Sequence, residues 1–174
     1  MKTLDEAHWW GYAALPEQAE YPLTTDKDPM TLICQFHLGE GMVYVFANLD
    51  YFFGDIDADG GHIGEWSEDL YKVLYSPTRE HLQEHEVVDA NDEPAVPAPI
   101  ALEENKESTV LTPATCWRDE LEQDYPGYQV LVDLEESDDL GLRFYDCGSL
   151  FFLIRPEDLA ARRFEHVKCA LYSY

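Results

Sequence analysis

Basic residues are scarce in this sequence. Only 11 residues are Lys or Arg, against 36 Asp and Glu in 174 residues, so the formal net charge is −25 at pH 7. Such a surface repels phosphate backbones and anionic bilayers, because nucleic-acid affinity depends on Lys and Arg releasing condensed counterions. We therefore expect no direct binding of nucleic acid and none of membranes. The same field attracts a cation or a basic protein surface.

Long apolar segments are also absent. Apolar runs such as Leu150 to Ile154 are far shorter than the about 20 residues that a membrane-spanning helix needs. The opening residues, MKTLDEAHWW, contain two acids and lack the apolar core of a secretory signal. From these two features we expect a cytoplasmic protein.

Signatures of several catalytic classes are missing as well. The sequence contains no G-x-S-x-G elbow, no local cysteine-protease signature, no P-loop and no dinucleotide fingerprint. The cysteines Cys34, Cys116, Cys147 and Cys169 are scattered without a CxxC pair. This spacing favours buried free thiols over a disulfide framework or a thiolate zinc site. We therefore expect a protein that is not an enzyme and that holds no cofactor.

Hydrophobic residues, in contrast, are abundant. They make up 45% of the chain, and aromatic residues make up 13%. This content is too rich for a disordered acidic tail, so the negative charge must lie on the surface of a folded body. The length fits a single domain over residues 1–174, or two small lobes that share a core.

Strand-like segments dominate the chain. Thr31–Leu38 and Met42–Ala47 are rich in β-branched and aromatic residues and are separated by Gly39-Glu40-Gly41, which predicts a hairpin. Further strands are expected at Tyr71–Tyr75, Tyr128–Leu134, Leu140–Tyr145, Leu150–Ile154 and Val167–Tyr172. Because the spacers are short and polar, we expect antiparallel pairing. The predicted fold class is α+β, mainly antiparallel β-sheet with a few short helices.

Three segments carry helix signals. Thr78–Glu86 follows Ser76-Pro77, a cap residue and a proline at the first helical position. The second helix is expected at about Cys116–Gln123, and the third at Pro156–Arg163, which opens with a proline and two acids. All three predicted helices are short.

A proline-rich stretch divides the chain. Asp92–Ile100 holds three prolines, which predicts an extended strap between lobes of about residues 1–90 and 101–174. The segments GMVYVFANLD (Gly41–Asp50) and GSLFFLIRPEDL (Gly148–Leu159) are loosely alike, each a glycine followed by an aromatic-aliphatic strand and an acid. Duplication into two pseudo-repeated lobes and convergent strand composition both account for this similarity.

Several segments resemble a known family. They are HWWGYAALPEQAEYP (His8–Pro22), TLICQFHL with Gln35, YKVLYSP (Tyr71–Pro77) and, most strongly, LRFYDCGSLFFLIRPEDLAARRFEHVKCALYSY at the end of the chain. Together they resemble the YwqG-like family, a domain of unknown function. The resemblance implies an α+β, mainly antiparallel fold and brings no established catalytic residues. Such domains are similar to immunity proteins of bacterial toxin systems, which protect their producer from a cognate toxin.

Carboxylates are concentrated in short clusters. Five of them lie within seven positions between two predicted strands, and a further cluster lies in the second predicted helix. A charge run can be a solvated face, but such an array also resembles a row of phosphates that would fit the basic groove of a nuclease. We predict an immunity protein that covers this groove of a basic, nucleic-acid-acting toxin. The predicted partner-binding residues are Asp133, Glu135, Glu136, Asp138, Asp139, Asp119 and Glu120.

A calcium-binding loop is the alternative. Asp55-x-Asp57-x-Asp59-Gly60 places three alternating carboxylates before a turn glycine, an arrangement that can converge on Ca²⁺. The later positions of a standard loop do not fit, since His62 and Trp66 stand where an apolar residue and a bidentate Glu belong. A small-ligand or Ca²⁺-binding module and a solvated acidic loop both remain open.

A third hypothesis is a zinc hydrolase. His81-x-x-Glu84-His85 matches the H-x-x-E-H pattern, in which helical spacing places both imidazoles on one face. The pattern also requires a third protein ligand and a long supporting helix. A solvated helix face is the competing interpretation.

Overall fold

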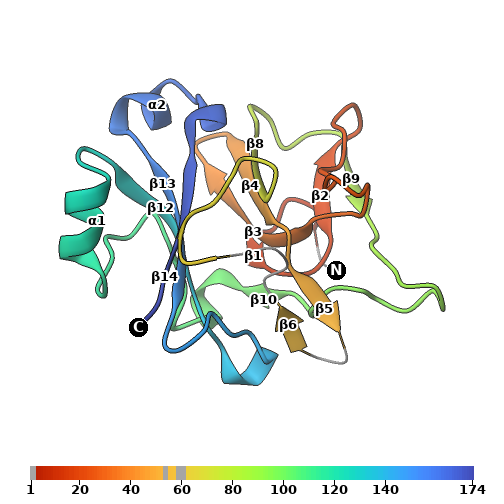
Figure 1. Ribbon diagram of the computed structural model, residues 1–174. Coiled ribbons are helices and arrows are strands. Elements are labelled where there is room, and N and C mark those ends of the chain that lie inside the picture. The colour runs from red at the N-terminus through yellow and green to blue at the C-terminus, as the bar shows by residue number, and fades with distance from the viewer. Residues whose placement is uncertain (1–2, 53–54, 58–61) are drawn as a thin grey trace.

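Two five-stranded antiparallel sheets form the body of the protein. The computed structural model describes residues 3–52, 55–57 and 62–174 (Figure 1). Its helices are short, with α1 at Arg118–Asp124 and α2 at Pro156–Ala160. The predicted α+β, mainly antiparallel fold class is confirmed. None of the helices in the described part of the chain is long and apolar enough to cross a membrane.

The first sheet has the strand order β10-β1-β3-β4-β8, and the second has the order β11-β12-β13-β14-β7. The first sheet consists of β1 (His8–Trp9), β3 (Thr31–Leu38), β4 (Gly41–Ala47), β8 (Tyr71–Ser76) and β10 (Ile100–Ala101). The second consists of β7 (Gly64–Glu65), β11 (Thr109–Val110), β12 (Gln129–Glu135), β13 (Ser149–Ile154) and β14 (Lys168–Tyr172). Two further antiparallel pairs are β2 (Ala13–Pro16) with β9 (Leu82–His85), and β5 (Asp50–Phe52) with β6 (Asp55–Asp57). Single 3₁₀ turns occur at η1 (Leu102–Glu104), η2 (Asp138–Leu140) and η3 (Phe164–His166).

The two large sheets have matching connectivity. In each, three long strands follow one another as neighbours, β3-β4-β8 in the first sheet and β12-β13-β14 in the second. A short strand precedes and flanks each set, β1 beside β3 and β11 beside β12. The central strands β4 and β13 lie within the two segments whose sequences are loosely alike.

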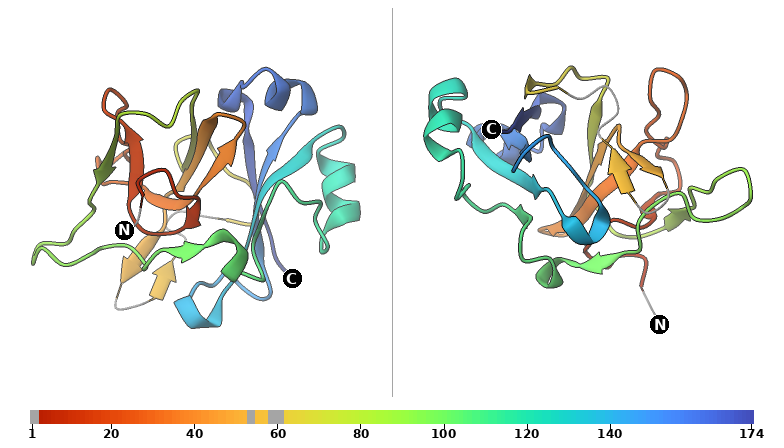
Figure 2. Two further views of the ribbon diagram at one scale, coloured as in Figure 1. Left: turned by 180° about the vertical axis from the view of Figure 1, so that it is seen from behind. Right: turned by 60° about the horizontal axis from the view of Figure 1, so that its bottom comes forward.

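One hydrophobic core lies between the sheets. Residues from both sheets, including Ile33, Val45, Leu134 and Phe152, belong to a single buried cluster. Burial of apolar area on this scale is the main force that stabilises a fold. The two sheets therefore pack face to face, as Figures 1 and 2 show.

Each sheet is also covered on its outer face. On the first sheet, β2 contributes Leu15 to a second buried cluster with Leu32 and Phe46. On the second sheet, Leu121 of α1 packs with Phe151 in a third cluster. The order of the layers is thus the β2–β9 pair, the first sheet, the second sheet and α1.

The proline-rich stretch runs along the first sheet. The carbonyl oxygen of Pro97 accepts a hydrogen bond from the Gly11 N–H at 3.0 Å, and Val96 is buried. Gly11 has a φ of +76°, and a Cβ at this position would lie 2.9 Å from Pro99. Only glycine combines this backbone conformation with so close an approach.

Most predicted elements are confirmed, but two are wrong. Leu140–Tyr145 is not a strand, because the chain forms η2 and turns at Gly141, which has a φ of 65°. Thr78–Glu86 is not a helix, because it contains β9, which pairs with β2. His81, with a φ of 54°, lies just before that strand. Tertiary pairing overrides the local helix signal here.

The cysteines are all free, but only two are buried. Cys34 and Cys169 lie in the core, where burial raises the pKa of both thiols. Cys116 and Cys147 are exposed. The expectation of buried thiols is therefore confirmed for the first two and wrong for the others.

Candidate binding surfaces

Asp133, the first residue of the predicted acidic cluster, is buried in the second sheet. It lies on β12 between Thr109 of β11 and Phe151 of β13, and it is 4% exposed. Burial, followed by the nearby charge of Glu135, raises the pKa of Asp133 to about 7, and a hydrogen bond with Ser149 opposes this shift. Oδ1 has no hydrogen-bond partner among the described residues. The sheet therefore covers Asp133 and separates it from the exposed carboxylates of the cluster, while its predicted contact with a partner stays a prediction.

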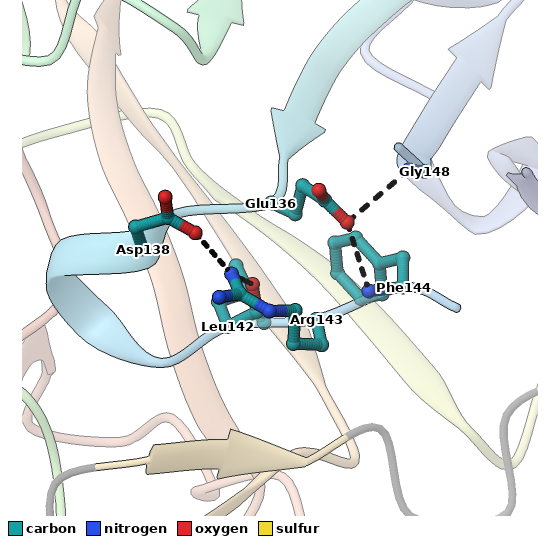
Figure 3. A network of polar contacts seen from close by, with 6 residues as sticks. All are labelled: Glu136, Asp138, Leu142, Arg143, Phe144 and Gly148. Atoms are coloured by element: carbon teal, nitrogen blue, oxygen red, sulfur yellow. Dashed lines mark hydrogen bonds and ion pairs between the residues drawn. The ribbon is translucent and has the colours of Figure 1, made fainter. Parts of the chain in front are cut away.

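The next two carboxylates lie at the end of β12. Glu135 is half-buried, and burial, then Glu107 and Glu136, raise its pKa. Glu136 accepts hydrogen bonds from the backbone N–H groups of Phe144 at 3.5 Å and Gly148 at 3.3 Å (Figure 3). Glu136 thus holds the following loop against the end of the strand, which is a structural role.

The exposed end of this cluster is η2. Asp138 forms an ion pair with Arg143 at 2.6 Å, and its side chain is 89% exposed (Figure 3). Asp139 is also exposed. An exposed ion pair of this kind contributes little to stability. Both carboxylates can therefore bind another molecule with little loss of stability.

The remaining predicted site residues lie on α1. Asp119 and Glu120 are exposed in its first turn, where negative charge favours the helix because the backbone N–H groups point toward it. Figures 1 and 2 show α1 and η2 at separate positions. The structure therefore does not join the two predicted acidic clusters into one patch.

Little of the negative charge is neutralised within the described part of the chain. The ion pairs found there engage three carboxylates, those of Glu65, Asp138 and Asp158. Since the chain holds 36 Asp and Glu, the surface carries a large excess of free carboxylates. Such a surface attracts cationic partners over distances comparable to the Debye length.

Of the calcium motif, Asp55 and Asp57 lie in β6, which pairs with β5, while Asp59 and Gly60 lie outside the described residues. No group of three or more His, Cys, Asp or Glu in the described ranges is arranged to hold a metal ion.

The zinc motif does not have the geometry that its pattern assumes. Glu84 and His85 are neighbours in β9, and successive strand residues point to opposite faces. The ring of His85 packs beside Tyr21, with centroids 5.6 Å apart. Helical spacing of His81 and His85 is therefore absent, because this segment is a strand.

A large hollow lies beside β8, on the face of the first sheet that carries β2. It has a volume of about 730 Å³, and we call it the β2-side hollow. Leu15, Met30 and Leu74 line it, together with the acidic residues Glu20, Glu68 and Asp69. Sequence reasoning missed it because these residues come from separate segments.

Tyr44 contributes an unusual group to the β2-side hollow. It lines the hollow and is only 1% exposed, and its hydroxyl has no hydrogen-bond partner among the described residues. Burial raises the pKa of this hydroxyl to about 12. A buried hydroxyl without a hydrogen-bond partner lowers the stability of a protein by about 1–3 kcal/mol. A ligand that forms a hydrogen bond with this hydroxyl recovers part of that free energy.

A second hollow lies on the other side of β8, beside η3. It has a volume of about 380 Å³, and we call it the η3-side hollow. Its walls include Val73 and Tyr75 of β8 and Phe164 of η3, and the rings of Tyr75 and Phe164 stack with centroids 5.4 Å apart. Arg162 and Glu165 supply charges of opposite sign.

Part of the chain matches a described protein family. Residues 80–172 match a family described as Domain of unknown function (DUF1963). The match covers more than half of the chain, from just before β9 to the end of β14. It includes both helices and every predicted partner-binding residue. No curated protein matches the chain.

Proposed function

Since this chain belongs to the family described as domain of unknown function DUF1963, we propose that it is a YwqG-like immunity protein without enzymatic activity. It acts in the cytoplasm of its producer, where it binds and neutralises a cognate toxin. The toxin carries a basic surface, and the fitting class is a nuclease-type effector whose substrate groove holds phosphates.

The single observation that supports this proposal most is the uncompensated negative charge. The net charge is −25, and the ion pairs of the described residues engage only Glu65, Asp138 and Asp158. Self-repulsion of this size destabilises a compact chain. A basic partner relieves it, which favours binding of a protein with a complementary surface.

The proposed mechanism is competition for the toxin's Lys and Arg residues. The exposed carboxylates of Asp119 and Glu120 on α1, and of Asp138 and Asp139 on η2, pair with side chains that otherwise hold phosphates. Glu135 is half-buried beside this surface. Charges at the rim of an interface act mainly by speeding association, so binding should be fast and weakened by salt.

The test begins with capture of the partner. The tagged protein is used in a pull-down from lysate of its producer, with washes at low and high salt and identification by mass spectrometry. The captured protein is then purified, and its nuclease activity is measured with and without the immunity protein. A basic nuclease that is inhibited stoichiometrically supports the proposal. A lysate that yields no basic partner, or a partner whose activity is unaffected, overturns it.

A charge-matched pair of variants then tests the surface. One variant carries Asp119→Asn, Glu120→Gln, Asp138→Asn and Asp139→Asn, and association with the toxin should slow by about tenfold or more. The control neutralises as many exposed acids elsewhere, through Asp26→Asn, Asp28→Asn, Glu86→Gln and Glu93→Gln. Equal association rates for the two variants would remove α1 and η2 from the interface.

A further inference from the structure

Strand β8 leaves one edge of the first sheet unpaired. Among the described residues it pairs only with β4, as the last strand in the order β10-β1-β3-β4-β8. Such an edge presents backbone N–H and C=O groups that can pair with another chain. The edge of β8 is therefore a potential template for an additional strand.

One hydrogen bond shows which residues present these groups. The N–H of Asn48 donates to the carbonyl oxygen of Leu70 at 2.8 Å, directly before the paired residues Ala47 and Tyr71. In an antiparallel pair, hydrogen-bonded and non-bonded positions alternate. The backbone groups of Lys72, Leu74 and Ser76 therefore face β4, and those of Tyr71, Val73 and Tyr75 face away from the sheet.

Hollows lie on both sides of this free edge. Of the β8 residues, Ser76 lines only the β2-side hollow and Val73 lines only the η3-side hollow, while Tyr71, Lys72, Leu74 and Tyr75 border both. Side chains of an extended strand point alternately to opposite faces. A strand added at the edge of β8 would thus place successive side chains into one hollow and then the other, as in strand-addition recognition.

The chemistry of the β2-side hollow selects a basic side chain. Leu15 and Met30 offer an apolar wall for a long aliphatic stem, while Glu20, Glu68 and Asp69 offer carboxylates for its charged end. The unpartnered hydroxyl of Tyr44 is able to accept a hydrogen bond from such a group. Lys and Arg combine a long stem with a donor end, and the three carboxylates of the hollow outnumber its one basic residue, Lys72.

The η3-side hollow fits an apolar side chain. Phe164 and Tyr75 form a stacked aromatic wall next to Val73, and the charges of Arg162 and Glu165 offset one another. The guanidinium of Arg162 already lies over the ring of Tyr75 at 5.7 Å. This side therefore offers contact area without excess charge.

We propose that β8 is the docking strand for an extended basic peptide segment of another protein, in which Lys or Arg alternates with apolar residues. The segment pairs with the backbone of Tyr71, Val73 and Tyr75, and its basic side chains enter the β2-side hollow. Charge favours this occupant over a second copy of the chain, because two molecules with a net charge of −25 repel. The site lies apart from α1 and η2 and does not depend on the immunity function.

The first test follows backbone protection with a defined probe. The probe is a capped peptide of about nine residues in which Lys alternates with Val, long enough to span β8. Adding it should slow amide hydrogen exchange at Tyr71, Val73 and Tyr75 by about tenfold or more. The amides of Lys72 and Leu74 already bond to β4 and serve as internal controls. Protection confined to other segments, or no binding at about 1 mM peptide, overturns the proposal.

The same peptide with N-methyl groups on alternate residues separates strand pairing from charge attraction. It keeps every Lys side chain but lacks the main-chain donors needed for pairing. We expect its affinity to fall by about tenfold or more, since its remaining attraction to an acidic surface is non-specific. Equal affinity for the two peptides would mean that charge alone holds the probe, which overturns the proposal.

Variants test the β2-side hollow. Tyr44→Phe removes only the hydroxyl, and Glu68→Gln with Asp69→Asn removes two carboxylate charges from the hollow. Each of these two variants should bind the peptide with an affinity about threefold to tenfold lower. The charge-matched control, Glu86→Gln with Glu93→Gln, should bind as the unchanged protein does. Equal loss in the control overturns the proposed site.

A dimer formed through β8 without peptide, detected by size-exclusion chromatography, overturns the choice of occupant.

Discussion

The hydroxyl of Tyr71 donates a hydrogen bond to the carbonyl oxygen of Val167 at 2.8 Å, across 96 positions of sequence. Tyr71 begins β8 in the first sheet, and Val167 directly precedes β14 in the second. The ring of Tyr71 also meets Phe152 edge-on, with centroids 6.1 Å apart. One side chain thus joins the two sheets by a polar bond beside their shared core.

Removal of this hydroxyl should destabilise the protein. Tyr71→Phe leaves the Val167 carbonyl without its partner in a buried position, at a cost of about 1–3 kcal/mol. Urea denaturation followed by fluorescence measures the change in the free energy of unfolding. Tyr174→Phe, at a residue that is 85% exposed, is the control and should change stability by less than about 0.5 kcal/mol. Equal effects of the two variants would show that the bond does not matter to stability.

Asp133 should make stability fall as pH rises. The pKa of this buried carboxyl is raised to about 7 from its ordinary value of 3.8, so the folded protein holds a proton between these values that the unfolded chain has lost. The contribution of this proton to stability is fully present below the ordinary pKa and is lost as the pH rises through the pKa of the folded protein. The variant Asp133→Asn cannot ionise at this position. Between about pH 4 and about pH 8, the free energy of unfolding of the unchanged protein should therefore fall by about 2–4 kcal/mol relative to that of the variant.

Urea unfolding at several pH values measures this difference. Asp139→Asn is the matched control, because it makes the same chemical change at an exposed position. The control should follow the unchanged protein across the whole range. Parallel curves for Asp133→Asn and the unchanged protein would contradict the prediction.

Gln35 should be necessary for the fold. It is fully buried on β3, its Oε1 accepts the Ala14 N–H at 3.1 Å, and its Nε2 donates to the Glu6 carbonyl at 2.8 Å. Gln35→Leu preserves the size of the side chain but leaves both backbone groups unpaired, at a cost of about 2–4 kcal/mol. Thermal unfolding provides the measurement, and Gln18→Leu, at an exposed turn, provides the control. A variant as stable as its control would contradict this role.

Salt should stabilise the protein. With a net charge of −25 and few internal ion pairs in the described residues, repulsion between carboxylates opposes folding. Raising NaCl from about 0.01 M to about 0.15 M shortens the Debye length from about 30 Å to about 8 Å. We expect a gain of about 1 kcal/mol, which corresponds to a rise in Tm of about 2–4 °C.

The variant with neutralised Asp119, Glu120, Asp138 and Asp139 provides a comparison for the salt effect. Its Tm at low salt should be higher than that of the unchanged protein, and its response to NaCl should be smaller, because fewer charges remain to be screened. Differential scanning calorimetry measures both quantities. A Tm that falls with added salt would show that attraction, and not repulsion, dominates the surface.

Sequence patterns predicted the elements that are stabilised by their own composition. β3 has the bounds that its β-branched and aromatic residues indicate, and α2 begins at Pro156 as predicted. Both signals are local, since they arise from backbone preferences of neighbouring residues. The helix expected at Thr78–Glu86 failed because β2, distant in the sequence, supplies a strand partner for β9.

The predicted acidic cluster shows the limit of such patterns for a binding surface. Residues 133–139 form one run in the sequence, but the fold assigns them different roles. Asp133 is buried between β11 and β13, Glu136 binds backbone N–H groups, and Asp138 and Asp139 are exposed. Strand geometry alternates side chains between faces, and only the packing of the sheet decides which face is covered.

The sequence by itself determined the fold class and the excess of negative charge, because these depend on composition and local preference. The tertiary structure alone decided the burial of Asp133, the free edge of β8 and the hollow that joins Tyr44 to Glu68. These features depend on contacts between residues far apart in the chain, such as that between Tyr71 and Val167. Their positions are set by the packing of the two sheets over a shared core.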